Sequence, residues 1–172
     1  MAERKSTKVT KRLAVCAALT ALALIFSYVE VLIPFSFGIP GIKLGLANIV
    51  VLISIYTLGP KYGLFINIAR ICLSALMFGN TFSALYALSG GLLSLAVMLL
   101  TKKAGIFSVI GVSMAGGVFH NLGQLMVAVA VMQTVKIMYY FPVLLISGMI
   151  TGILTGFIAA LVLRALRQVS YN

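Results

Sequence analysis

Two groups of polar side chains interrupt long apolar stretches of the sequence. Arg70 lies in the middle of one stretch, and His120, Asn121 and Gln124 lie in the middle of another. An ionisable side chain at the centre of a bilayer costs about 2.5–3.5 kcal/mol on insertion scales, so such residues commonly mark functional sites. In a helix, His120 and Gln124 would share one face. Together these residues could bind a polar or anionic ligand, and Glu30 is the only acidic residue that could neutralise Arg70.

A packing role explains the same residues without a ligand. A buried arginine can hold carbonyl groups or form an internal ion pair, and polar side chains in membrane helices often hydrogen-bond to the next helix. In the ligand interpretation, Asn48, Asn80 and Lys43 would complete the rim of a pocket. The sequence alone leaves both interpretations open.

Catalytic and metal-binding chemistry is not indicated. The sequence contains no Asp, and its only acidic residues are Glu3 and Glu30, whereas Mg²⁺ with a bound diphosphate is usually held by carboxylates. It also lacks a phosphate-binding P-loop, an HExxH motif and a metal-type cysteine spacing. Cys16 and Cys72 lie in apolar runs and are expected to be buried. We therefore expect no enzyme, no metal site and no cofactor.

Membrane helices must position these residues. Of 172 residues, 62% are hydrophobic and 9% are charged, and the mean hydropathy is +1.18, whereas about a quarter of a soluble domain is charged. The apolar runs are long and do not alternate, which favours helices over a barrel. Prolines and glycines divide the chain into expected helices at 13–33, 44–58, 61–78, 82–100, 106–132 and 139–167. The sequence thus predicts an all-α integral membrane protein with about six transmembrane helices in one bundle.

The basic residues predict how this bundle is oriented. We expect a basic cytoplasmic tail at 1–12, a membrane domain at 13–168 and a short cytoplasmic end at 169–172. With the N-terminus inside, ten basic residues fall on the inner side and only Lys43 and Lys136 on the outer side. Cytoplasmic loops carry such an excess. This uneven distribution predicts a plasma-membrane protein with both termini in the cytoplasm. It also explains the net charge of +11, so that no nucleic-acid partner is needed.

Small residues mark two expected helix contacts. Gly148, Gly152 and Gly156 recur every four residues in the last expected helix, a spacing typical of close helix packing. A second set of small residues lies in the inner half of the first expected helix: Ala14, Ala17, Ala18 and Ala21. Spacing alone does not tell whether this second set meets the chain's own helices or a partner.

Four stretches resemble a known family: residues 40–48, 78–80, 89–91 and 116–124, the last reading GGVFHNLGQ. They resemble the membrane family labelled heptaprenyl diphosphate synthase component I, also called the Gx transporter family, over nearly the whole chain. That family looks similar to the S components of energy-coupling factor transporters. Those are six-helix proteins that hold a vitamin-like ligand near the outer face and depend on a coupling protein and ATPases.

The resemblance implies two alternative functions. In the first, the chain is a transport subunit that captures a small polar or anionic ligand from outside at Arg70, His120, Asn121 and Gln124. The alanines of the first helix would then dock a membrane coupling protein and its ATPases. In the alternative, the chain is a non-catalytic accessory protein for isoprenoid or quinone synthesis, and its polar residues only pack helices. Prenyl diphosphate synthases resemble one another through aspartate-rich motifs, so a chain without Asp is at most an accessory subunit.

Overall fold

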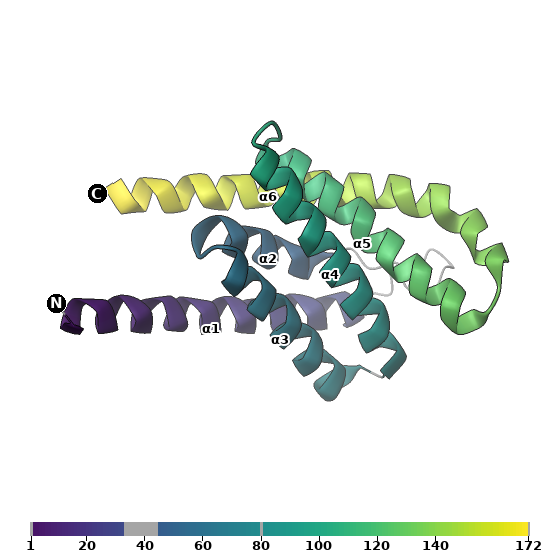
Figure 1. Ribbon diagram of the computed structural model, residues 1–172, viewed down its shortest axis with the longest axis horizontal. Helices are drawn as coiled ribbons and strands as arrows, with labels where there is room; N and C mark the ends of the chain where they lie inside the picture. The colour runs from purple at the N-terminus through teal and green to yellow at the C-terminus, as the bar shows by residue number, and fades with distance from the viewer. Residues whose placement is uncertain (1, 33–44, 80, 172) are drawn as a thin grey trace.

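The computed structural model describes residues 2–32, 45–79 and 81–171, and the side chains of residues 9–168 within these ranges. Its elements are α1 (Ala2–Leu32), α2 (Leu46–Thr57), α3 (Pro60–Phe78), α4 (Thr81–Ala104), α5 (Val109–Met132), the 3₁₀ helix η1 (Val135–Tyr140) and α6 (Phe141–Tyr171). Five helical segments are long and apolar enough to cross a membrane. The predicted all-α, multi-pass membrane protein is confirmed (Figure 1).

Several helix ends differ from the prediction for local reasons. The segment expected to be a tail is helical from Ala2, since it contains good helix formers and no Gly or Pro. Helix α4 continues to Ala104 and stops at Gly105, whose φ of 74° suits glycine. Helix α5 begins at Val109, three residues later than expected, because the Ser108 side chain caps it by accepting the Gly111 N–H at 3.2 Å.

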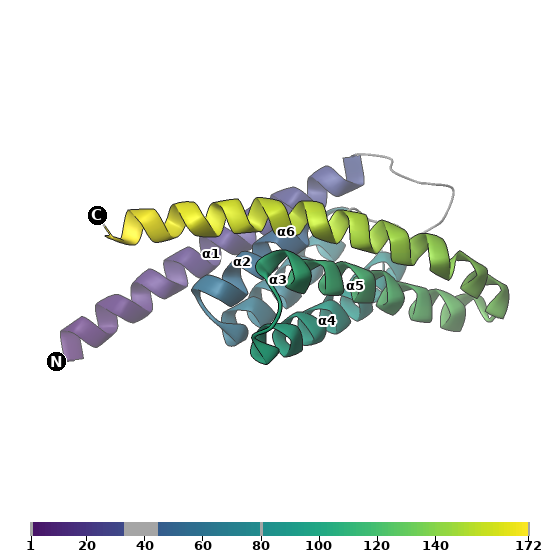
Figure 2. The same ribbon diagram turned by 90° about the horizontal axis from the view of Figure 1, so that it is seen from above.

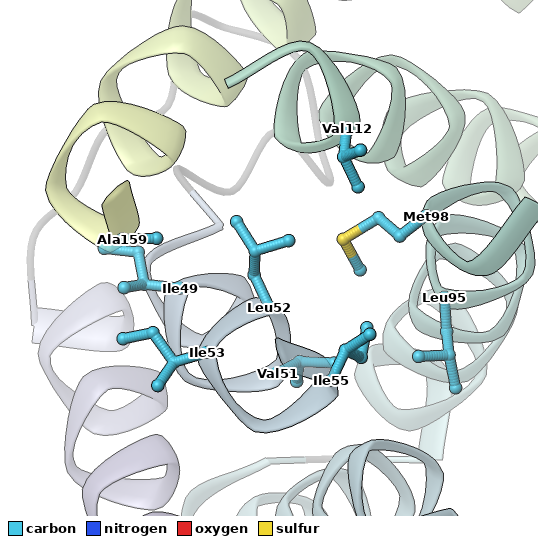
Figure 3. Close-up of a cluster of buried hydrophobic side chains, with 9 residues drawn as sticks. All are labelled: Ile49, Val51, Leu52, Ile53, Ile55, Leu95, Met98, Val112 and Ala159. Carbon is cyan, nitrogen blue, oxygen red and sulfur yellow. The ribbon is translucent and has the colours of Figure 1, made fainter. Parts of the chain in front are cut away.

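Helix α2 is the shortest α-helix in the described part of the chain and lies at its core. Its 12 residues extend about 18 Å, well short of a hydrocarbon core of about 30 Å. Every residue from Ile49 to Ile55 is buried, and Figure 3 shows Leu52 and Ile55 of α2 near Met98 of α4 and Val112 of α5. Because other helices surround α2, it does not have to match the thickness of the lipid.

Helices α5 and α6 pack more extensively than any other pair in the described chain. A Cβ atom added at Gly152 would lie 2.6 Å from the Cα atom of Met114, and one at Gly156 would lie 2.8 Å from the Cα atom of Ile110. Only glycine therefore permits this backbone approach. The predicted packing stripe on the last helix is confirmed, and its partner is α5.

The cysteines have different environments. Cys16 is buried as expected, but Cys72 is exposed, so the prediction that both are buried was wrong. Cys72 lies on the outer surface of a bundle that faces lipid, where a small apolar side chain is as well tolerated as in a core. Hydropathy could not distinguish these two surroundings.

Both termini lie at the same end of the bundle, together with the α2–α3 and α4–α5 connections, whereas η1 lies at the other end (Figures 1 and 2). At the first end, Lys61 lies in the first turn of α3, and Lys102 and Lys103 lie in the last turn of α4, whereas η1 carries Lys136. The predicted topology requires this arrangement, with both termini on one side of the membrane and Lys136 on the other.

We expect cysteines that replace Lys103 and Lys136 in a Cys-free variant to be labelled from opposite sides of the membrane. The cysteine at position 103 should react only after the cytoplasmic side is opened, because the excess of basic residues predicts that this side faces the cytoplasm. The measurement is labelling of intact cells and inverted vesicles with an impermeant thiol reagent. Reaction of both positions in intact cells would contradict the proposed orientation.

Candidate functional site

Arg70 lies buried near the middle of α3, and side chains from three helices hold its guanidinium. Its Nε and Nη2 atoms donate to Oδ1 of Asn67 at 3.2 and 3.0 Å. Nη2 also donates to Oδ1 of Asn48 at 3.2 Å, and Nη1 reaches Oγ of Ser27 at 3.5 Å. Asn67 in turn donates through Nδ2 to the carbonyl of Gly91 at 2.9 Å. The arginine is thereby connected to α1, α2 and, through Asn67, α4.

Glu30 of α1 supplies the negative charge beside Arg70. Its Oε1 atom accepts the backbone N–H of Leu46, the first residue of α2, at 2.7 Å. Gly45 precedes that helix and offers no side-chain cap, so Glu30 serves as the acceptor for an otherwise unsatisfied donor. The same carboxylate attracts the Arg70 guanidinium. The Glu30 carboxylate thus accepts one backbone N–H at the start of α2 and attracts a buried cation.

His120 and Gln124 of α5 form the other part of the site. Their side chains meet, with 3.1 Å between the two Nε2 atoms, as the four-residue spacing predicts. Asn121 points away from them and donates through Nδ2 to the carbonyl of Leu144 on α6 at 2.8 Å. Asn121 therefore joins two helices, whereas His120 and Gln124 face α4. A Cβ atom at Gly90 of α4 would lie 2.7 Å from the His120 carbonyl oxygen.

Two small cavities connect these groups. The first, of about 30 Å³, is lined by Arg70, Glu30, Asn48 and His120 among others. The second, of about 10 Å³, shares Asn48 and His120 with the first and is lined by several hydroxyl groups. A water molecule needs about 10–15 Å³, whereas ligand pockets usually measure about 300–1,000 Å³. The site can hold a few waters as it stands, and a larger ligand requires the helices to move apart.

We call Arg70, Glu30, Asn48, Asn67 and His120 the polar centre. Four of these residues were predicted from the sequence as site residues, and the structure brings all five together. Asn67 was missed, as was Ser27. Each lies three residues before a charged residue that had been identified, so helical spacing could have found both. Lys43 and Asn80, also proposed as site residues, lie outside the described residues.

The alanines of the first helix lie on an uncovered surface. Four of them are exposed in the structure: Ala14, Ala17, Ala18 and Ala21. Neighbouring Cys16 and Ala23 are buried against the chain's own helices. The proposed docking face is thus exposed on the surface of the bundle.

These features define a multi-pass helical membrane protein with a hydrogen-bonded charge in its interior. Within the described ranges, no group of three or more His, Cys, Asp or Glu residues could hold a metal ion. The sequence matches the family described as "Heptaprenyl diphosphate synthase component I" over residues 19–162, and the chain belongs to this family. All four stretches that carry the resemblance fall within that range. No curated protein and no solved structure matches the chain.

Proposed function

We propose that the chain is a non-catalytic membrane subunit that works with a separate catalytic protein in prenyl diphosphate synthesis. The family description names one component of a synthase. The role of Glu30 carries the non-catalytic part of the proposal. It is the only acidic residue whose side chain the structure describes, and it is engaged with the Leu46 N–H and Arg70. It is therefore not available to bind Mg²⁺ and a diphosphate.

The product chemistry gives a reason for such a subunit. A heptaprenyl chain is strongly apolar, and burying each CH₂ group in the bilayer contributes about 0.8 kcal/mol. The heptaprenyl group therefore partitions into lipid, while its diphosphate stays at the membrane surface. A bundle of membrane helices can hold the catalytic protein at that boundary, where the growing product resides. The extended ends of α1 and α6 lie on the side of the bundle that we assign to the cytoplasm (Figures 1 and 2).

A second candidate function is ligand capture for transport, and the polar centre favours it. Ionisable residues inside a membrane bundle frequently line substrate pathways, and Arg70, Glu30 and His120 border one cavity. The exposed alanines of α1 would then dock a coupling protein, since small residues permit close helix contact. In this function the two small cavities would have to open to admit a ligand.

Co-purification from native membranes distinguishes the two functions. We expect the tagged protein, in mild detergent, to recover a prenyl diphosphate synthase catalytic subunit and its prenyl transfer activity. Mass spectrometry of the same sample identifies bound small molecules. Recovery of ATPases and a membrane coupling protein, with a bound metabolite, would instead support transport and contradict the first proposal.

Ala18→Trp is expected to reduce recovery of the protein partner, because the large ring separates helices that pack closely. Ile158→Trp is the matched control, since Ile158 is an exposed residue of α6. Recovery is measured by quantitative mass spectrometry relative to the tagged protein. Equal recovery by wild type and Ala18→Trp would show that partners do not bind at the alanine face.

A further inference from the structure

A groove of about 550 Å³ lies where the C-terminal end of α2, the start of α5 and the C-terminal half of α6 meet. It shares no lining residue with the cavities of the polar centre. Its volume falls within the range of about 300–1,000 Å³ that is usual for sites that bind small molecules. It lies toward the end of the bundle that carries both termini (Figure 1).

Among the side chains that the structure describes, the charged ones that line or border this groove are all positive. Arg164 and Arg167 both line it, three residues apart on α6. In the part of the chain that the structure describes, neither guanidinium has a hydrogen-bond or ion-pair partner. Tyr56 forms another wall, and Nζ of Lys102 lies 4.4 Å from the centre of its ring. The groove therefore attracts anions, and the planar fork of arginine matches the oxygens of a phosphate.

The start of α5 adds backbone donors on the same side. The Ser108 side chain accepts the Gly111 N–H at 3.2 Å, and the Ser108 carbonyl accepts the Val112 N–H at 2.9 Å. The N–H groups of Val109 and Ile110, at the first turn, have no acceptor within their own helix. Both residues line the groove. The positive end of the helix dipole thus reinforces the two arginines.

Apart from Thr57, the remaining walls are apolar. Ala160, Leu163 and Leu166 line the groove on α6, and Ile106 and Phe107 are exposed in the segment before α5. A soluble phosphate compound would use only the charged part of this surface. A lipid would use both parts, because its acyl chains could follow α6 into the bilayer while its phosphate meets the arginines.

We propose that this groove binds the phosphate group of an anionic membrane lipid. The proposal does not depend on the function proposed above. We expect native mass spectrometry of the purified protein to show tighter binding of phosphatidylglycerol than of phosphatidylcholine. Arg164→Gln combined with Arg167→Gln should weaken phosphatidylglycerol binding about thirtyfold, since each basic residue near a bilayer surface contributes roughly fivefold.

Two further variants make the test specific. Lys11→Gln with Arg12→Gln removes the same charge from exposed positions of α1 and should leave binding unchanged. Ala160→Phe fills the groove without changing its charge and should weaken binding. Thermal melts confirm that each variant is folded, and if Ala160→Phe does not fold, the arginine pair alone decides.

Three outcomes would overturn the proposal. The first is that the arginine double variant binds phosphatidylglycerol as tightly as the wild type does. The second is equal affinity for phosphatidylcholine, which would show that charge plays no part. The third is competition by glycerol 3-phosphate as effective as that by phosphatidylglycerol, because the site would then recognise a soluble phosphate and not a lipid.

Discussion

Replacing Arg70 by alanine is expected to lower the free energy of unfolding in detergent by about 2–4 kcal/mol, because each acceptor left without its donor costs about 1–3 kcal/mol. The Glu30 carboxylate would lose the cation that attracts it. Oδ1 of Asn67 and of Asn48 would lose the donors that they share. Each buried acceptor left unsatisfied adds to the loss. Chemical denaturation followed by intrinsic tyrosine fluorescence measures the change.

Two variants control for this experiment. Lys61→Ala removes an exposed cation from the same helix and should change stability by less than about 0.5 kcal/mol. Adding Glu30→Gln to Arg70→Ala should restore part of the stability, because the uncompensated charge is removed. Wild-type stability together with complete loss of a co-purifying ligand would instead show that Arg70 serves ligand binding and not packing.

Gly152→Ala is expected to destabilise the protein by about 1–3 kcal/mol or more, the range for overpacked interiors. The new Cβ atom would lie 2.6 Å from the Cα atom of Met114 and 2.8 Å from the carbonyl oxygen of Ser113. Neither backbone atom can move unless α5 and α6 separate, so contacts along the whole pair are lost. The same unfolding measurement tests the expectation.

Gly111→Ala is the matched control for this prediction. Gly111 lies in α5, on the other helix of the pair, and its Cβ atom would be 3.5 Å from the Cδ1 atom of Phe107, which is an ordinary contact. This substitution should be neutral or stabilise the helix by up to about 1 kcal/mol. Equal effects of Gly152→Ala and Gly111→Ala would show that the glycine stripe does not set the distance between the two helices.

Periodicity and composition were enough to predict the class of fold. The apolar runs separated by Gly59-Pro60 and by Gly105 reveal helices because these residues interrupt them for local reasons. The glycine stripe of α6 could likewise be recognised, since a four-residue period places its members on one face. What these patterns do not contain is the identity of the neighbouring helix. The assignment of α5 as the partner needed three-dimensional coordinates.

The polar centre shows the same limit more sharply. The sequence singled out Arg70, Glu30 and His120 because ionisable groups are costly in a bilayer. It could not show that Arg70 obtains its hydrogen bonds from Asn67, nor that Asn121 turns to α6. Successive helical positions differ by about 100°, so neighbours such as His120 and Asn121 can serve different partners.

The burial of the short helix α2 has a consequence for how the protein is made. Its 12 residues cannot cross the bilayer as an independent segment, and an exposed helix end in lipid would leave backbone groups unsatisfied. We therefore expect α2 to enter the membrane as a hairpin with α3 and to remain loosely placed until α6, which is synthesised later, packs against it. A nascent chain that ends before α6 should be degraded quickly, although each of its longer segments is apolar enough to insert.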